Sequence, residues 1–377
     1  MKNYGRTSLE EFLGGRVVYR NLVPADPQLP GLAETAARIG LPAGRVPRKS
    51  EADYARVILS LLERAQGLRG VRQPLRRLLY VGDTRLLDGK AFANLCAAGG
   101  WPGLAFIGSE DTRPPAIEML PGEAGGSIYL ANRWSAMADF AAYSAGHGFP
   151  VDEATAVVVD IDKTALGARG RNGGVIDAAR LQALEDTVAG LLGPAFDPVS
   201  FRAAYRLLNE PEFHPFTADN QDNLAYLCLM LGCGLVPLET LVDGIRSGQL
   251  ASFGELLEWV EVRRVELPAA VAAAHADFLA RVRSGDPTPF KSFRRREYQL
   301  TRALFGSLAD DAPVERLLAE EIVVTQEVRA LALDFQAQGA LLFGLSDKPD
   351  EAAGPSREEA AAGGLPIHRA VAHAVGE

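Results

Sequence analysis

Two carboxylates separated by one residue follow a short apolar run. The segment AVVVDIDKTALG, residues 156–167, contains three β-branched residues that stop at Asp160, followed by Asp162 and Thr164. Such a run is typical of a strand buried in a parallel sheet. In open α/β sheets the chemistry takes place beyond the carboxyl ends of the strands. The spacing therefore suggests one nucleophile and one proton donor.

A calcium-binding loop or a solvated turn is the alternative for an Asp-x-Asp pair. A calcium loop needs further acids and a glycine within the same loop. Residues 165–174 read ALGARGRNGG, and the next acid is Asp177. The pattern therefore fits a calcium loop poorly.

A second apolar run ends in a Gly-Asp-Thr turn. Residues 77–90 read RLLYVGDTRLLDGK, which places Asp83, Thr84 and Asp88 just after the run 78–81. Asp83 or Thr84 could cap the helix that follows. The same loop could also bind a metal, because capping and metal binding are compatible.

Two further strand-like runs near the carboxyl end also stop at polar residues. The run 322–324 ends at Thr325, and the run 340–343 leads through a Ser-Asp turn to Lys348. Between them lies a helical stretch that Gly339 closes. Each of these two signals is weak alone, since a threonine at a strand end usually packs and a surface lysine is usually solvated.

Together the four segments resemble the four signatures of the haloacid dehalogenase-like (HAD) phosphohydrolases. A typical member has the nucleophile first, then Thr or Ser, then Lys, and the Gly-Asp signature last. Here the Gly-Asp signature comes first and the others follow in order. We therefore expect a circularly permuted HAD fold, which is physically accessible because domain termini usually lie on the surface and often close together.

The resemblance implies phosphoryl transfer through an aspartyl-phosphate. Asp160 would be the nucleophile, and Asp162 would protonate the leaving oxygen and then deprotonate water. The expected cofactor is Mg²⁺, held by Asp160, the backbone carbonyl of Asp162, and Asp83. Asp88 would lie in the coordination shell or just outside it.

Two lysines compete for the phosphoryl group. Lys348 is preferred because it directly follows a strand. Lys49, in VPRKSEADYA, precedes the helix that leads into the Gly-Asp strand, where many family members carry their phosphate-binding lysine. The resemblance implies that Thr325 acts with the lysine on the phosphoryl oxygens. Further candidate substrate contacts are Thr84, Thr164, Lys291 and Arg294.

The expected fold class is α/β, with a Rossmann-like parallel sheet and a large helical cap. We expect strand 156–159 to lie between 78–81 and 322–324. Strand 103–108 should flank the former neighbour, and 340–343 the latter. Residues 1–166 and 319–377 would form the core, and the helical segment 167–318 would form the cap.

Composition narrows the class of protein. The chain has 377 residues, which exceeds one ordinary domain, and a net charge of −9, which disfavours nucleic acid as a partner. There is no run long enough to span a membrane, no signal-like segment and no CxxC pair among three cysteines. We therefore expect a cytoplasmic enzyme with a small phosphorylated substrate, in an oligomeric state that the sequence leaves open.

Three other functions fit parts of the pattern. A dehalogenase on the same fold needs no magnesium and generally lacks the second aspartate, so Asp162 and the Gly-Asp-Thr turn count against it. A phosphotransferase or mutase would pass the phosphoryl group to a sugar instead of water. A non-catalytic binding protein would retain the fold and the metal site without turnover.

Overall fold

The computed structural model describes residues 1–42 and 44–377. They form two compact units, one of Met1–Ala178 with Thr301–Glu377 and one of Ala179–Leu300. Residues 167–178 and 301–318, which the sequence placed in the helical segment, belong to the first unit. Within the described ranges, no helix is both long enough and apolar enough to cross a bilayer.

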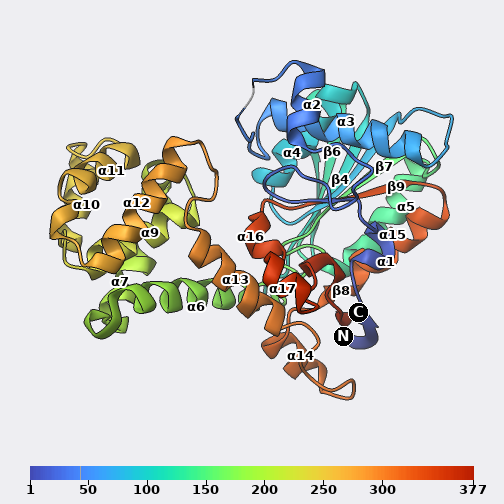
Figure 1. The fold of residues 1–377 in the computed structure, drawn as a ribbon. Helices are drawn as coiled ribbons and strands as arrows, with labels where there is room; N and C mark the ends of the chain where they lie inside the picture. Colours follow the sequence, from blue (N-terminus) through green and yellow to red (C-terminus); the bar gives the residue numbers. More distant parts are fainter. Residues whose placement is uncertain (43) are drawn as a thin grey trace. The chain divides into compact units, whose positions relative to one another are not determined.

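A seven-stranded sheet forms the centre of the first unit (Figure 1). In spatial order its strands are β2(Val17–Val18), β9(Leu341–Leu345), β7(Thr155–Asp160), β3(Arg77–Gly82), β4(Gly103–Gly108), β6(Gly126–Ala131) and β5(Ile117–Pro121). All neighbouring strands pair in parallel except β5 and β6. Every residue of β4, β7 and β9 is buried, as in strands that are covered on both faces. The expected α/β class with a mostly parallel sheet is confirmed.

The order of the strands agrees with the sequence in part. β3 lies beside β7, with Leu78 opposite Ala156, and β4 lies on the other side of β3. The expectation that 322–324 is the second neighbour of β7 is wrong, because β9 occupies that position. Leu341–Leu345 is a buried five-residue run, which suits a central position better than a two-residue strand does.

The segment at 322–324 instead leads into a separate three-stranded sheet. Its order is β1(Lys2–Thr7), β10(Ala372–Gly376) and β8(Val324–Thr325). β8 pairs in parallel with β10, and the backbone N–H of Thr325 donates to the carbonyl of Ala165 at 2.9 Å. β8 therefore lies against the loop that follows β7 rather than against β7 itself.

Helices cover both faces of the large sheet (Figure 1). On one face lie α2(Leu32–Ile39), α3(Ala52–Leu68) and α4(Leu87–Gly99), and on the other α1(Glu10–Leu13), α5(Met137–Gly146) and α15(Gln326–Ala337). The apolar side of α3, including Ile58 and Leu61, packs with Tyr80 and Val158 in one buried cluster. The remaining short elements are η1(Glu123–Gly125), η2(Trp134–Ala136), α14(Val314–Glu320), α16(Asp350–Ala353), α17(Arg357–Ala361) and η6(Ile367–Arg369).

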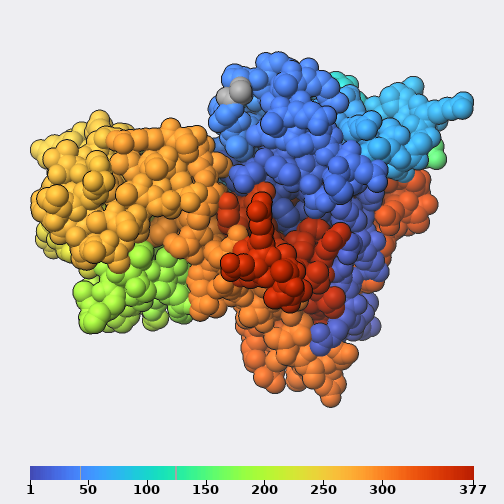
Figure 2. All heavy atoms as spheres, in the orientation of Figure 1, coloured from blue at the N-terminus to red at the C-terminus, as the bar shows by residue number. Residues whose placement is uncertain are grey.

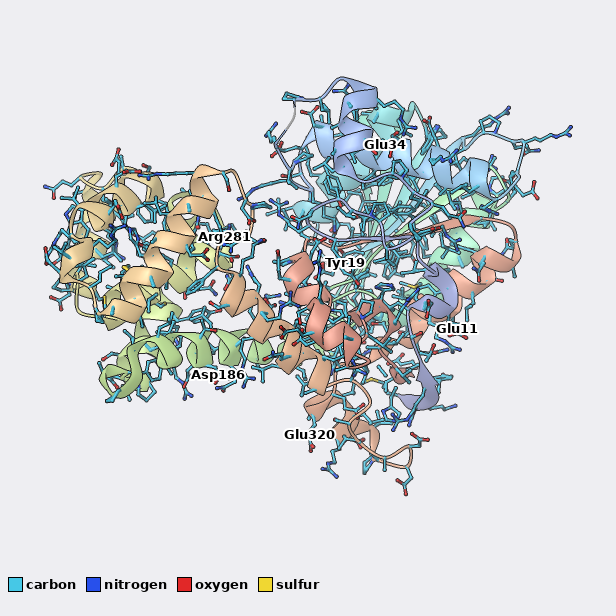
Figure 3. All side chains as sticks on the ribbon, in the orientation of Figure 1. Glu11, Tyr19, Glu34, Asp186, Arg281 and Glu320 are labelled. Carbon is cyan, nitrogen blue, oxygen red and sulfur yellow. The ribbon has the colours of Figure 1, made fainter. Side chains whose placement is uncertain are left out.

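The amino- and carboxyl-terminal segments of the first unit lie side by side (Figure 2). β1 pairs antiparallel with β10, and the backbone N–H of Arg20 donates to the carbonyl of Lys348 at 3.1 Å. The hydroxyl of Tyr19, labelled in Figure 3, lies 3.1 Å from Nδ1 of His368. Residues at opposite ends of the chain therefore meet near the carboxyl end of β2.

The second unit is helical, and residues 179–300, all of which the structure describes, contain no strand. Between α6(Gly173–Leu192) and α13(Lys291–Ala303), which cross its boundaries, lie η3(Gly193–Ala195), α7(Pro198–Leu208), η4(Pro211–Phe213), α8(His214–Thr217), α9(Gln221–Gly232), α10(Leu238–Ser247), α11(Phe253–Val262), η5(Arg264–Glu266) and α12(Ala269–Arg283). Side chains of Asp197, Asn220 and Ser252 cap α7, α9 and α11. An apolar core centred on α9 joins these helices.

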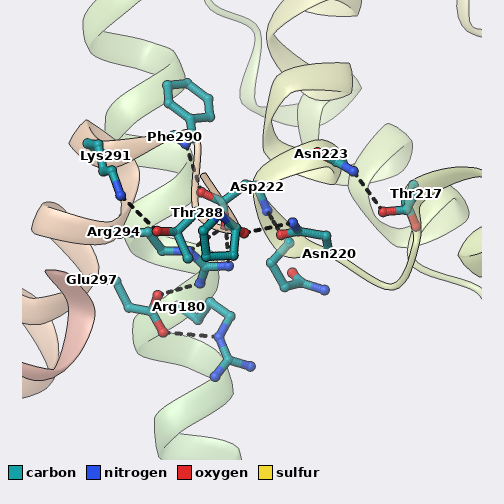
Figure 4. A network of polar contacts seen from close by, with 12 residues as sticks. Arg180, Thr217, Asn220, Asp222, Asn223, Thr288, Phe290, Lys291, Arg294 and Glu297 are labelled. Atoms are coloured by element: carbon teal, nitrogen blue, oxygen red, sulfur yellow. Dashed lines mark hydrogen bonds and ion pairs between the residues drawn. The ribbon is translucent and has the colours of Figure 1, made fainter. Parts of the chain in front are cut away.

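A buried ion network fixes α13 within this unit (Figure 4). Arg294 donates to Asp222 at 2.8 Å and to Glu297 at 2.7 Å, and both carboxylates are fully buried. Arg180 donates to Glu297 at 3.1 Å, and the backbone N–H of Phe290 donates to Asp222 at 2.9 Å. Each carboxylate therefore has a cation and at least two hydrogen bonds, as buried ions require.

Replacing Arg294 with Met should loosen the helical unit. The change leaves Asp222 and Glu297 buried without their shared cation, which costs about 3–5 kcal/mol. Hydrogen exchange of the α9 amides should accelerate accordingly. Arg283→Met is the matched control, because Arg283 pairs with Glu258 on the surface and should contribute under about 1 kcal/mol. Unchanged exchange in the Arg294 variant would mean that the fold does not need this side chain.

Candidate functional site

Three aspartates meet at the carboxyl edge of the large sheet. β3 and β7 run in parallel with Val81 opposite Val159, so Asp83 and Asp160 emerge at the same edge. Asp88 joins them from the first turn of α4. One carboxylate oxygen from each lies within 4.8 Å of the others. We predicted from the sequence that these three side chains share one metal site, and the structure brings them together.

Asp88 is held rigidly by the turn that precedes it. One of its oxygens accepts from the backbone N–H of Asp83 at 3.1 Å, and from the backbone N–H and hydroxyl of Thr84, both at 2.9 Å. The other accepts from Tyr80 at 3.1 Å. A side chain at Gly82 would lie 2.6 Å from the Asp88 Cβ, so glycine is required there. Thr84, a candidate for substrate binding, orients Asp88.

Lys49 lies between two of the aspartates. Its ammonium group donates to Asp88 at 2.6 Å and to Asp160 at 2.5 Å, and it is only 4 % exposed. Burial disfavours the charged form, but the two carboxylates outweigh burial and hold the pKa of Lys49 well above its usual value. Burial also opposes ionisation of Asp88, yet Lys49 and the Thr84 backbone keep the pKa of Asp88 below its usual range.

For Asp160 and Asp83, the neighbouring cations do not outweigh the effect of burial on the pKa. Burial raises the pKa of Asp160 well above its usual value; Lys49 opposes the shift, and the charges of Asp88 and Asp83 add to it. Burial and Asp88 raise the pKa of Asp83 to about 7, although Arg169 donates to it at 2.5 Å. Two cations thus face three carboxyl groups, and an added cation would favour the ionised form of Asp160 and Asp83.

Arg169 was not singled out in the sequence. It lies in the glycine-containing loop after β7, where its carbonyl accepts from the Trp134 indole at 3.1 Å and from the backbone N–H of Glu110 at 2.9 Å. Gly170 has a φ of +79°, and a side chain there would come within 1.9 Å of the Glu110 carbonyl. The position of Arg169 between Gly167 and Gly170, just after a buried strand, is the sequence signal that could have identified it.

The loop after β7 also places the two threonines. The hydroxyl of Thr164 donates to Asp160 at 2.9 Å. The hydroxyl of Thr325 donates to the backbone carbonyl of Thr164 at 2.5 Å. Thr164 therefore orients the expected nucleophile, and Thr325 supports the loop that carries it.

The structure gives the two competing lysines different neighbours. Lys348 is buried, and its Nζ lies 4.0 Å from Asp162, whose side chain is 24 % exposed. Lys49 contacts the nucleophile and Asp88 instead. Both lysines therefore lie at this edge of the sheet, each beside different aspartates.

Ser346 was given no role in the sequence analysis. It follows β9, and Asp160 is paired with Leu345 across the sheet, so Ser346 lies beside the carboxyl end of β7. It is 1 % exposed, and its hydroxyl accepts from the backbone N–H of Lys348 at 2.9 Å. A serine directly after an apolar run was the available signal. It occupies the sheet position that the sequence had assigned to Thr325.

Lys291 and Arg294 belong to the second unit and have partners there. Lys291 donates to Asp286 and to Thr288, both at 2.9 Å. Arg294 is 5 % exposed within its ion network. Their expected contacts with substrate remain a prediction.

Replacing Lys49 with Met should destabilise the free protein by about 3–5 kcal/mol near pH 8, because the carboxylates lose a buried cation. The loss should shrink towards about pH 5. Without Lys49 the carboxylates bind protons more tightly in the folded state than in the unfolded state, so stability falls as pH rises. Urea denaturation measures both effects. Lys90→Met, which removes a surface pair with Glu123, is the control. Equal stability of Lys49→Met and wild type would contradict this account.

Comparison with known proteins assigns no family. No protein family, curated protein or solved structure matches the chain. The chemical interpretation of this site therefore depends on its residues and their geometry.

Proposed function

We propose that the chain is a Mg²⁺-dependent phosphatase that hydrolyses a small phosphorylated metabolite through an aspartyl-phosphate. The observation that carries the proposal is the cluster of Asp83, Asp88 and Asp160 around the Lys49 ammonium at the carboxyl edge of a parallel sheet. Open α/β sheets bind their ligands at this edge. The cluster offers both a carboxylate nucleophile and ligands for a hard cation.

The residues fit magnesium by the nature of their donors. All three offer carboxylate oxygens, which Mg²⁺ prefers, and two cationic side chains, Lys49 and Arg169, contact them. Asp160 and Asp83 would hold the ion, with the backbone carbonyl of Asp162, and Asp88 would lie at or near the coordination shell. When bound, the ion would neutralise charge between a carboxylate and a phosphoryl group.

Asp160 is oriented for nucleophilic attack. Lys49 holds one of its oxygens, and the Thr164 hydroxyl holds the other. In the proposed first step a carboxylate oxygen forms a bond to phosphorus, and the bond from phosphorus to the substrate oxygen breaks. Asp162 gives a proton to that leaving oxygen and takes one from the water that later cleaves the aspartyl-phosphate. Its partial exposure makes it accessible to substrate and water.

The phosphoryl oxygens require donors and positive charge. We assign these roles to Lys49, Lys348 and Ser346, which all lie at the carboxyl edge near Asp160 or Asp162. Ser346 replaces Thr325 in this proposal, because the Thr325 hydroxyl donates to the Thr164 carbonyl. Such preorganised groups stabilise charge that develops in the transition state.

The proposed fold is a circularly permuted HAD core. In its support, β3 with Asp83 precedes β7 with Asp160 in sequence, and the two strands are neighbours in the sheet. We propose that the helical unit Ala179–Leu300, inserted between the strands that carry Asp160 and Ser346, serves as the cap and selects the substrate. A screen of phosphorylated metabolites for phosphate release would identify that substrate.

Asp160→Asn should abolish phosphate release, by on the order of 10³-fold or more, because the amide cannot attack phosphorus. The variant should retain the wild-type circular dichroism spectrum and lose binding of fluoroberyllate, a mimic of the acyl-phosphate. Asp139→Asn, an exposed aspartate on α5, is the control for a lost surface charge. Substantial activity in purified Asp160→Asn would remove this residue from the nucleophilic role.

Chelation should stop phosphate release, and added Mg²⁺ should restore it. Asp83→Ala should reduce the Mg²⁺-dependent increase in Tm more than Asp88→Ala does. The reason is that Asp88 already accepts five hydrogen bonds, which leaves fewer lone pairs for a metal. Full phosphate release in excess chelator would contradict the Mg²⁺ dependence, whereas halide release from a haloacid, without phosphate release, would favour a dehalogenase. Phosphate release that depends on a sugar acceptor would indicate a phosphotransferase.

A further inference from the structure

Tyr54 has a buried hydroxyl with no hydrogen-bond partner among the described residues. It lies in the first turn of α3, five residues after Lys49, and is 1 % exposed. Its ring packs in the apolar cluster between α3 and the sheet. Burying a hydroxyl without a partner costs on the order of 1–3 kcal/mol, so a purely structural position would favour phenylalanine.

Contacts of two neighbours place Tyr54 near the reactive edge of the sheet. Lys49, five residues earlier, donates to Asp160, and Tyr80, in the same buried cluster, donates to Asp88. The charges of Asp347, Lys49 and Asp160 all act on the Tyr54 hydroxyl. These three charged residues come from three segments that converge there, namely the loop after β9, the entry to α3 and the end of β7. Burial and the two carboxylates raise the pKa of Tyr54, so the phenol stays protonated and can only donate to an anion.

Tyr80 provides a contrast within the same cluster. Its hydroxyl donates to Asp88 at 3.1 Å, so its donor is already used by the protein. The Tyr54 hydroxyl has no acceptor in residues 1–42 and 44–377, and the charges of Lys49 and of the candidate nucleophile Asp160 act on it. A neutral donor of this kind can bind a phosphoryl oxygen without changing the net charge of the cluster.

We propose that the Tyr54 hydroxyl donates a hydrogen bond to the phosphoryl group bound beside Asp160, and that Tyr54 is therefore a further substrate-binding residue. The inference rests on the proposed function. It adds a donor from α3 to Lys49, Lys348 and Ser346.

Tyr54→Phe tests the proposal through two measurements on the full chain. Urea denaturation without ligand should show equal or greater stability than wild type, because no hydrogen bond is lost. Titration with inorganic phosphate in the presence of Mg²⁺ should show affinity reduced by about 10- to 100-fold, as expected for a lost hydrogen bond to a charged group. Tyr226→Phe is the matched control, since Tyr226 lies 2.6 Å from His275 in the helical unit. It should lose stability and keep the phosphate affinity of wild type.

The possible failures are distinguishable. Wild-type phosphate affinity in Tyr54→Phe, while wild type itself binds phosphate and fluoroberyllate, would overturn the role of Tyr54 and leave the proposed function standing. A loss of stability in free Tyr54→Phe would show that the hydroxyl has a partner in the free protein, and would also overturn it. If wild type binds neither phosphate nor fluoroberyllate and releases no phosphate, the proposed function fails and the role of Tyr54 fails with it.

Discussion

The ion contact of Lys49 with Asp88 and Asp160 makes the rest of the site possible. Three carboxylates within 4.8 Å of one another repel strongly in a buried setting, and removing them from water adds a further cost. The Lys49 ammonium group offsets part of the repulsion and part of the desolvation cost. Hydrogen bonds from Thr84 and Thr164 satisfy carboxylate oxygens that the lysine does not reach, and Tyr80 donates to the same Asp88 oxygen as the lysine. The same contact ties the entry to α3 to β7 and α4, so the charge balance and the packing of the sheet edge depend on each other.

Close backbone approaches make this arrangement sterically possible. Gly82 leaves room for the Asp88 side chain, and Gly170 lets the loop carrying Arg169 lie against the Glu110 carbonyl. Arg171, in the same loop, is buried between Glu110 and Glu327 and joins the loop to α15. The segments around the acidic cluster are thus joined to one another by close backbone approaches and ion pairs.

The sequence predicted the parts of the fold that depend on long apolar runs. Strands 78–81, 103–108 and 156–159 pair as expected, because such runs are stable only when covered on both faces. It wrongly placed 322–324 instead of 340–343 beside 156–159, since both are short apolar runs and only long-range pairing decides between them. The partner of β8 is β10, whose sequence AHAVG consists mostly of small residues and gives little sign of a strand.

The site was predictable at its carboxylates and less so around them. An aspartate at the end of a buried parallel strand is expected at the carboxyl edge of the sheet. The sequence left open whether Thr84 contacts substrate or its own turn. In the structure its hydroxyl donates to Asp88 within the turn. Lys49 precedes a helix and Lys348 follows a strand, and both positions suit a lysine that binds phosphate. Their positions in the sequence alone therefore could not decide between them. Ser346 was hidden because its importance depends on β9 lying next to β7.

The position of β9 has a consequence for synthesis of the chain. β7 is complete once Asp160 has emerged, but one of its edges stays unpaired until β9 arrives, after the whole helical unit has been made. At ordinary translation rates of about 5–20 residues per second, that interval is roughly 10–35 s. During this time an apolar strand offers free N–H and C=O groups to other chains. A nascent chain of this topology therefore has a defined period in which this strand edge is open to pairing with other chains.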